Sequence, residues 1–493
     1  MLKITFVSHG RDMADPTAAA AMPVFEDAPL PQALASAIER ATNGRFGGAP
    51  GASAVFLAPA WLDVGALVLI GAGPRAKLDD AGFERIGGEA LTLASTHGLK
   101  GLILRLPEIA PQAAAHAALG ARLSAYRFHR HKTKPKASDT VSVATLEVEV
   151  DDPDACRDAF APLDGLADGV FLARDLVSEP ANILHPEAYA VRMKALDIPG
   201  LEIEIIDEAG LEALGAGSLL SVGLASPYQT CMAVLRWRGA ADPEAPPIAF
   251  VGKGVTFDTG GISIKPAAGL EEMKADMGGS AAIAGALLAL AARKARINAV
   301  GVLCIVENAI GGGALRPGDI VTAMSGRTIE VINTDAEGRL ALADGLTYCR
   351  DRFKPRVMVD VATLTGAVMV ALGLDYGGLY SEDGALAEAL IAAGQAEGEL
   401  LWRLPMPESY DRHIESLAAD VKNVAVGIGR SGGASIAARF LKPFAGDTPW
   451  AHLDISGPAW PTTSAAPTIP AGATGYGVRL LHRFASSFED TAP

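Results

Sequence analysis

Short apolar runs alternate with longer Ala-rich segments along the first 125 residues. The longer segments carry apolar residues at helical spacing, so the pattern predicts an alternation of strands and helices. The predicted strands are Lys3–Val7, Ala54–Leu57, Ala66–Ile70 and Gly101–Leu106, and the predicted helices are Gly82–His97 and Pro111–Tyr126. This order of elements predicts a small α/β domain.

The pattern changes after residue 126. A basic stretch, Arg127–Lys136, precedes a predicted strand at Val141–Val150, a polar turn and a helix from about Ala155 to Val177. We expect the domain boundary inside this helix, which gives an N-terminal domain of residues 1–165 and a second domain of residues 166–493.

Apolar runs in the second part show no alternation with polar residues, which is typical of parallel strands buried on both faces. The predicted strands are Pro247–Gly252, Ala299–Glu307, Val357–Ala362 and Ala451–Ile455, and the predicted helices are Glu271–Ala295, Glu337–Phe353 and Ala385–Glu397. The expected fold class is α/β: a small N-terminal α/β domain and a larger α/β catalytic domain with a mainly parallel central sheet flanked by helices. Ligands of such sheets bind at the carboxyl ends of the strands, so catalytic and metal-binding residues are expected there.

The composition indicates which binding partners and which cellular compartment are compatible with this protein. The 493 residues include 42 basic and 57 acidic side chains, and the net charge of −15 makes binding to nucleic acid unlikely, because phosphate repels a negative surface. The four cysteines form no CxxC pair, which fits a reducing compartment. The apolar stretch Ala281–Ala292 is shorter than the roughly 20 residues of a membrane span. We therefore expect a cytoplasmic protein without a membrane anchor.

Five charged residues are candidates for a site, four at predicted strand ends or in loops and one in a helical pattern, and each has an ordinary explanation when taken alone. They are Lys253, Asp258, Asp276, Asp335 and Glu337. A lysine at a strand end can extend to solvent, and an aspartate in a Gly-rich loop commonly forms a turn. An aspartate in a helical pattern usually faces solvent. Asn333 or Asp335 could cap the following helix, with Glu337 in its first turn.

The same residues taken together point to a metal centre. Carboxylate oxygens are the ligands that hard or borderline divalent cations need, and a pair of such cations requires bridging carboxylates. Carboxylates packed this closely without a cation would repel one another and take up protons. Lys253, Lys265 and Arg339 add cationic groups beside them. These residues favour a hydrolase with two metal ions.

Two motifs then identify a family resemblance. The segment NTDAEGRL, Asn333–Leu340, and the segment KGVTFDTGG, Lys253–Gly261, resemble the leucyl aminopeptidases, which are cytosolic metallo-exopeptidases of the M17 type. The resemblance covers roughly residues 165–490, and the first 160 residues match less sharply. Further matching segments are Arg316–Met324, Ala362–Ala367, Leu401–Pro405, Lys422–Asn423 and Trp450–Ile455.

The resemblance implies an activity and a set of metal ligands. The activity is release of N-terminal leucine and other mainly apolar residues from peptides by a water activated by two metal ions, Mn²⁺ or Zn²⁺ or else Mg²⁺. One ion would be held by Asp258, Asp335 and Glu337, and the other by Lys253, Asp258, Asp276 and Glu337. Lys253 would have to bind as a neutral amine, so its pKa would have to be depressed.

The resemblance also implies catalytic and substrate-binding roles. Lys265 would stabilise the oxyanion, and Arg339 would hold a bicarbonate that transfers protons. Met273, Thr363, Leu364 and Gly366 would bind the substrate, although sequence alone would place them in the core. Family members form homohexamers, so a homohexamer is expected here. The Met273–Ser280 helix departs from the common family form, which changes the expected pocket shape rather than the ligands.

Two other functions fit single features. Gly429–Gly433 matches the G-x-S-x-G elbow of serine hydrolases around Ser431, with Asp447 and His452 downstream. The basic stretch Arg127–Lys136 could bind nucleic acid in a regulatory protein that keeps a vestigial site. Neither interpretation explains the group of carboxylates and lysines.

Overall fold

The structure is a computed structural model that describes residues 2–9, 15–28, 32–136, 139–427 and 431–489. The chain forms two compact units. The first comprises Met1–Ala167 with Thr463–Pro470, and the second comprises Asp168–Thr462 with Ala471–Pro493. The expected fold class, two α/β domains with a mainly parallel catalytic sheet, is confirmed.

A six-stranded sheet forms the centre of the first unit, in the order β1-β6-β5-β2-β4-β3. All neighbouring strands are parallel except β3, which pairs antiparallel with β4. The strands are β1 (Lys3–Ser8), β2 (Asp15–Phe25), β3 (Ser53–Leu57), β4 (Val64–Gly73), β5 (Gly101–Arg105) and β6 (Thr145–Val150). The helical elements are α1 (Gln32–Thr42), η1 (Arg75–Lys77), α2 (Asp80–Thr96), α3 (Pro111–Ser124) and the start of α4 (Pro153–Ser178).

Strand β2 was not expected from the sequence. Its core is four consecutive alanines, Ala18–Ala21, which carry no β-branched or aromatic side chain and favour helix by intrinsic propensity. All four alanines are buried, because the strand lies between β4 and β5. Tertiary pairing therefore overrides local preference in this strand.

An eight-stranded sheet forms the core of the second unit, in the order β15-β14-β17-β13-β9-β10-β8-β7. The four predicted strands correspond to β9 (Ile248–Asp258), β10 (Asn298–Asn308), β13 (Val357–Ala362) and β17 (Trp450–Asp454), and these are mutually parallel as expected. Antiparallel pairings occur toward both edges. The remaining strands of this sheet are β7 (Leu201–Ile206), β8 (Cys231–Arg238), β14 (Gly377–Tyr380) and β15 (Leu401–Arg403).

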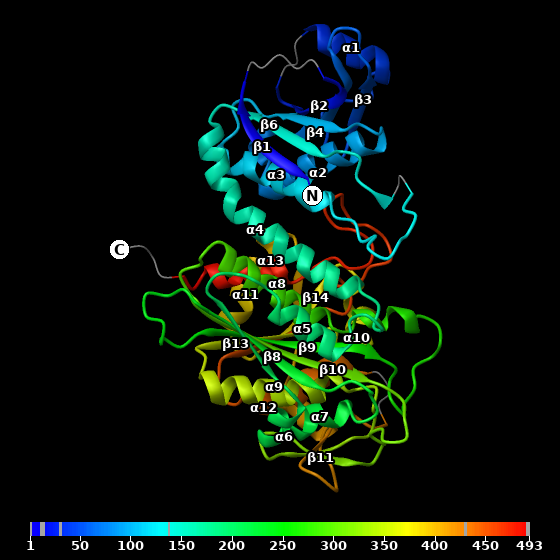
Figure 1. Ribbon diagram of the computed structural model, residues 1–493, viewed down its shortest axis with the longest axis vertical. Coiled ribbons are helices and arrows are strands. Elements are labelled where there is room, and N and C mark those ends of the chain that lie inside the picture. The colour runs from blue at the N-terminus through cyan, green and yellow to red at the C-terminus, as the bar shows by residue number, and fades with distance from the viewer. Residues whose placement is uncertain (1, 10–14, 29–31, 137–138, 428–430, 490–493) are drawn as a thin grey trace. The chain divides into compact units, whose positions relative to one another are not determined.

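Helices cover both faces of this sheet (Figure 1). Helix α8 (Gly278–Ala292) packs on β9, β10 and β13 from one side, with α11 (Gly384–Glu397) and α13 (Val478–Ser486) beyond it. Helix α9 (Gly338–Phe353) packs on the same strands from the other side, with α7 (Gly217–Val222) and α12 (Gly433–Ala445). The other elements are α5 (Pro186–Lys194), α6 (Glu208–Ala213), α10 (Gly366–Leu372), η4 (Glu408–His413) and a small sheet of β11 (Ile320–Thr322), β12 (Thr328–Glu330) and β16 (Val421–Lys422).

The predicted helix Glu271–Ala295 is broken in the structure. A 3-10 helix, η3 (Leu270–Ala275), ends at Asp276, and α8 begins at Gly278. The break coincides with a close approach of α8 to β13, because a Cβ on Gly279 would lie 1.9 Å from the carbonyl oxygen of Val361. Within the described residues, one helical stretch is long and apolar enough to cross a membrane, Leu270–Ala292, and it is buried in this core.

Candidate metal centre

Strand β9 supplies two of the charged residues. The strand is longer than predicted, so Lys253 lies inside it rather than after it, and Asp258 is its last residue. The chain then turns at Gly260, whose φ of +85° favours glycine, and the amide of Gly260 donates a hydrogen bond of 2.8 Å to Asp258 Oδ1. Lys253 and Asp258 are both 2% exposed, so β9 holds two buried charges, one in its middle and one at its carboxyl end.

The loop before α9 supplies two more carboxylates. Asn333 Oδ1 accepts a hydrogen bond of 2.9 Å from the amide of Asp335, and Thr334 Oγ1 donates one of 2.6 Å to the carbonyl of Gly260. Glu337 is the residue before α9, and its side chain makes no capping hydrogen bond. The alternative of a helix capped by Asn333 or Asp335 is therefore wrong, and neither the Asp335 nor the Glu337 carboxylate is used as a helix cap.

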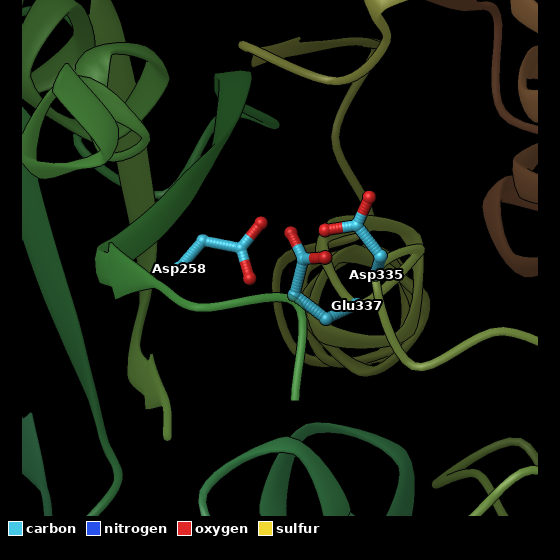
Figure 2. Close-up of side chains that lie close together, drawn as sticks. All are labelled: Asp258, Asp335 and Glu337. Atoms are coloured by element: carbon cyan, nitrogen blue, oxygen red, sulfur yellow. The ribbon is translucent and has the colours of Figure 1, made fainter. Parts of the chain in front are cut away.

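Three carboxylates converge at this edge of the sheet. One oxygen from each of Asp258, Asp335 and Glu337 lies within 4.8 Å of the other two (Figure 2). Asp258 and Glu337 are buried, and Asp335 is partly buried. Buried carboxylates at this spacing require compensating positive charge, and their oxygens are suitable ligands for a divalent cation.

Asp276 and Lys253 lie next to these three carboxylates. Lys253 Nζ lies 2.8 Å from Asp276 Oδ1 and 2.9 Å from Glu337 Oε1, and it donates a hydrogen bond of 2.9 Å to the carbonyl of Thr363. The second oxygens, Asp276 Oδ2 and Glu337 Oε2, are buried and have no hydrogen-bond partner among the described residues. Unpartnered buried carboxylate oxygens are costly unless they bind a cation, so the donor set fits a metal site.

Lys265 contacts two of the three converging carboxylates. Its Nζ lies 2.8 Å from Asp258 Oδ2 and 2.5 Å from Asp335 Oδ1. Lys253 and Lys265 therefore each contact two carboxylates, and together they contact all four.

The pKa values reflect this crowding of charge. Burial raises the pKa of Asp258, to about 7, and that of Asp276, and the negative charge of Glu337 adds to both shifts. Burial acts in the same direction on Glu337, but the charges of Lys253 and Lys265 outweigh it and lower the pKa of Glu337. Burial disfavours the charged form of Lys253, yet the surrounding carboxylates raise its pKa above the ordinary value. Lys253 is therefore protonated until another cation takes over this compensation.

Arg339 is the second residue of α9, two positions after Glu337. It is 7% exposed, and Nη1 donates a hydrogen bond of 2.7 Å to the carbonyl of Asn423. Burial lowers its pKa to about 10, and the charges of Glu337 and Asp454 oppose the shift. A guanidinium with this pKa stays charged at neutral pH, so Arg339 presents a fixed positive charge to the site.

Two adjoining cavities contain all of the predicted site residues. A cavity of about 250 Å³ is lined by the four carboxylates and Lys253, and by Thr363, Met369 and Trp460. A second cavity, of about 460 Å³, is lined by Arg339 and by residues that include Asn333, Val424 and Ile436. Lys265, Met273, Asp335, Leu364 and Gly366 line both. The structure thus brings together eleven residues that are spread over more than 100 positions of the chain.

The structure also shows supporting residues that the sequence interpretation missed. Asn308 Nδ2 donates hydrogen bonds to Asp258 Oδ1, at 2.7 Å, and to the carbonyl of Thr334, at 3.1 Å, so it connects two metal-site segments. Asn308 ends β10, the parallel neighbour of β9, and a search for polar residues at adjacent strand ends could have found it. Asn423 Nδ2 similarly donates to the carbonyl of Asn333 at 2.7 Å.

The serine-hydrolase alternative is not supported by the geometry. His452 is completely buried, and its Nδ1 lies 2.6 Å from Asp360, whereas Ser431 is exposed. Strand β16 ends at Lys422, so no described strand leads directly into the motif. Gly429 and Arg430 lie outside the described residues.

Comparison with known proteins identifies the family. The model of the catalytic domain of the cytosol aminopeptidase family matches residues 171–482, and the model of its N-terminal domain matches residues 17–135. The chain belongs to the cytosol aminopeptidase family. The predicted leucyl aminopeptidase function, that of a metallo-exopeptidase, is confirmed.

Individual relatives in this family match nearly the whole chain. A probable cytosol aminopeptidase of Caulobacter vibrioides is 52% identical over 95% of this chain and 96% of its own length. Another, from Gluconobacter oxydans, is 49% identical and covers 94% of each chain. Among solved structures, the bottromycin maturation enzyme BotP in complex with Mn has a TM-score of 0.84 at 32% identity, covering 97% of this chain and 100% of that one. A mutant of tomato leucine aminopeptidase has a TM-score of 0.84 at 30% identity, covering 99% and 97%.

Proposed function

We propose that the chain releases N-terminal leucine and other mainly apolar residues from peptides at a centre that holds two divalent cations. The observation that carries this proposal is the convergence of Asp258, Asp335 and Glu337, with Asp276 and Lys253 beside them. Four carboxylates and two lysines would be an unfavourable arrangement in a structural core, and they become a favourable one around divalent cations.

The ligands divide into two sets that share two residues. One cation would be held by Asp258, Asp335 and Glu337, where the carbonyl of Asp335 is a further donor. The other would be held by Lys253, Asp258, Asp276 and Glu337, which uses the unpartnered oxygens of Asp276 and Glu337. Lys253 must lose its proton to bind a cation, so loading of this second set should release a proton.

The donor atoms favour particular metals. Carboxylate oxygens with one amine nitrogen, and no thiolate, suit Mn²⁺ or Zn²⁺, and Mg²⁺ is a third candidate. The similar enzyme BotP was solved with Mn, which makes Mn²⁺ the first ion to test.

The mechanism assigns separate tasks to this chain's own residues. Bound divalent cations supply Lewis acidity, which lowers the pKa of a water and polarises a carbonyl. The Lys265 ammonium, which lines both cavities, stabilises the negative charge that develops on the scissile carbonyl oxygen. Arg339 contributes a planar, permanently charged fork in the larger cavity, which suits a bicarbonate that accepts and returns the proton.

The cavity walls account for substrate binding. Met273, Thr363 and Gly366 surround the smaller cavity and receive the first side chain, and the flexible thioether of Met273 adapts to different apolar residues. Leu364 lies on the wall that both cavities share, where it contacts the peptide backbone. The larger cavity accepts the residues that follow the scissile bond.

Membership of this family is also the basis for a proposed oligomeric state and cellular location. We propose a homohexamer that acts on peptides in the cytoplasm, since similar proteins are named cytosol aminopeptidases. Light scattering should give a mass near six times 50.8 kDa, and a monomer mass would contradict the assembly.

Chelation tests the activity. Purified protein is treated with EDTA, then assayed on a Leu-initiated dipeptide before and after addition of Mn²⁺, Zn²⁺ or Mg²⁺. We expect loss of activity with EDTA and recovery with at least one ion. Activity that survives EDTA but is abolished by a serine-reactive phosphonate would contradict the proposal.

A further inference from the structure

The loop after β13, residues 363–366, connects the metal centre to a buried acid that has no role so far. At the start of the loop, the Thr363 carbonyl accepts a hydrogen bond from Lys253, and Thr363 Oγ1 donates one of 2.9 Å to Asp276 Oδ1. These bonds fix one end of the loop to the metal centre. The next two residues, Leu364 and Thr365, are held by a different acid, Asp454.

Asp454 accepts hydrogen bonds from Leu364 and Thr365 of this loop. It is the last residue of β17, pairs with Ala362 of β13, and has no exposed surface. Its Oδ1 accepts hydrogen bonds from the amides of Leu364, at 3.1 Å, and Thr365, at 3.4 Å, and its Oδ2 accepts one of 2.7 Å from Thr365 Oγ1. Ser456 adds two more donors to Oδ1, its hydroxyl at 2.8 Å and its amide at 3.3 Å.

The direction of the Thr365 hydroxyl bond is determined by a second contact. Thr365 Oγ1 also accepts a hydrogen bond of 3.1 Å from the amide of Val368, which caps the first turn of α10. An amide can only donate, so the hydroxyl proton is available for Asp454. A buried carboxylate that accepts such bonds makes them stronger than bonds between neutral groups. The loop and the start of α10 are therefore fixed together by one acid.

We infer that Asp454 is a positioning residue that sets the place of Leu364 and Gly366 for binding of the peptide. Both residues line the two cavities, and so does Thr365 itself. The inference rests on the proposed function, because it assumes that the peptide lies along this wall. It assigns the effect of Asp454 to substrate binding rather than to the cations, because the described hydrogen bonds of Asp454 go to Leu364, Thr365 and Ser456 and not to any proposed metal ligand.

The neighbouring strand offers a matched control. Asp360 of β13 is also completely buried, and it accepts a hydrogen bond of 2.8 Å from Trp450 Nε1 and contacts His452 Nδ1 at 2.6 Å. It has no described bond to the loop. Removal of its charge should lower stability, as for Asp454, but should leave the loop in place.

Four variants test the inference in the Mn²⁺-loaded enzyme: Asp454→Asn, Thr365→Val, Thr365→Ser and Asp360→Asn. KM and kcat are measured with a Leu-initiated dipeptide, and Mn²⁺ affinity is measured by calorimetry. Loss of a hydrogen bond to a charged group predicts that Asp454→Asn and Thr365→Val raise KM about tenfold, with Mn²⁺ affinity changed by less than about twofold. In Thr365→Val, which keeps the charge that Asp454 presents to Arg339, kcat should also change by less than about twofold. Thr365→Ser keeps the hydroxyl and should restore the KM of the wild type, and Asp360→Asn should leave KM unchanged.

Several outcomes would overturn the inference. They are a Thr365→Val variant with the KM of the wild type, an Asp360→Asn variant with the same rise in KM, or a loss of Mn²⁺ binding in Asp454→Asn. If Asp454→Asn does not fold, the pair of Thr365 variants decides alone. A wild type that does not cleave the dipeptide refutes the proposed function and this inference with it, whereas an active wild type with unchanged Thr365→Val refutes this inference only.

Discussion

Gly338 should be essential because of the space that it leaves for Lys253. It is the first residue of α9 and follows Glu337 directly. A Cβ at this position would lie 2.5 Å from Lys253 Cε, 2.7 Å from Cδ and 2.8 Å from Nζ, which is closer than such atoms approach one another. Its φ lies outside the left-handed region, so alanine fits the backbone here and only the contact with Lys253 opposes it.

The cost of Gly338→Ala can be worked out from the contacts of Lys253. Its Nζ has three partners at 2.8–2.9 Å, two of them charged. Displacement of a buried charge from its partners costs about 3–5 kcal/mol, and the better helix propensity of alanine returns up to about 1 kcal/mol. We therefore expect a net loss of about 2–4 kcal/mol, divided between folding stability and the affinity of the cation set that contains Lys253.

The assay combines calorimetric titration of Mn²⁺ with denaturant unfolding of the metal-free protein. Gly345→Ala is the control in the same helix, because its Cβ would meet Cys304 Sγ at 2.3 Å and Val251 Cγ1 at 2.9 Å rather than Lys253. Gly338→Ala should weaken one of two Mn²⁺ sites, and Gly345→Ala should lower stability while both sites keep their affinity. Two unchanged sites in Gly338→Ala, or equal weakening in both variants, would refute the reasoning.

Further variants test the carboxylates, a buried acid and the rejected nucleophile. Asp335→Asn and Glu337→Gln should each abolish dipeptide hydrolysis with unchanged circular dichroism, because each removes a proposed ligand; an active double variant would contradict the site. Burial raises the pKa of Glu399 from 4.5 to about 7, so its protonated form is the one that the fold favours. The contribution of Glu399 to stability is therefore full below about pH 4.5, and about 3 kcal/mol of it is lost as the pH rises to about 7. Glu399→Gln should remove this dependence in denaturant unfolding, and curves parallel to the wild type would count against it. Ser431 lines the larger cavity, so Ser431→Ala can change KM but should leave kcat unchanged, and a loss of kcat would support the serine alternative.

The sequence predicted the central strands well because their composition leaves few alternatives. Uninterrupted apolar runs such as Pro247–Gly252 are typical of a strand buried on both faces, and β9 occupies that position between β13 and β10. Strand β2 could not be predicted, because its alanines have no preference for a strand and acquire one only between two neighbours. The break between η3 and α8 depends on the approach of Gly279 to Val361, which is a contact across 82 positions. Such contacts have no local pattern.

The candidate site, like the fold, could be predicted from the sequence only in part. Residues at predicted strand ends and loops, such as Asp258 and Glu337, could be proposed as ligands because parallel strands direct their carboxyl ends to one edge. Two supporting residues, Asn308 and Asp454, also end strands of this sheet, so the same search could place them at this edge. Their roles could not be predicted, because Asn308 donates to and Asp454 accepts from segments that lie close only after folding. The roles of the eleven predicted residues in binding metal and substrate stay predictions until they are tested directly.

The most direct test of the metal centre is diffraction from crystals grown with Mn²⁺, with data collected at the manganese absorption edge. The account predicts two anomalous peaks per subunit, one within reach of Asp258, Asp335 and Glu337, and the other beside Lys253 and Asp276. Both peaks should disappear or weaken in Glu337→Gln, which removes the carboxylate that the two sets share. Peaks located away from these residues, or an absence of peaks in an enzyme that Mn²⁺ activates, would contradict the central claim.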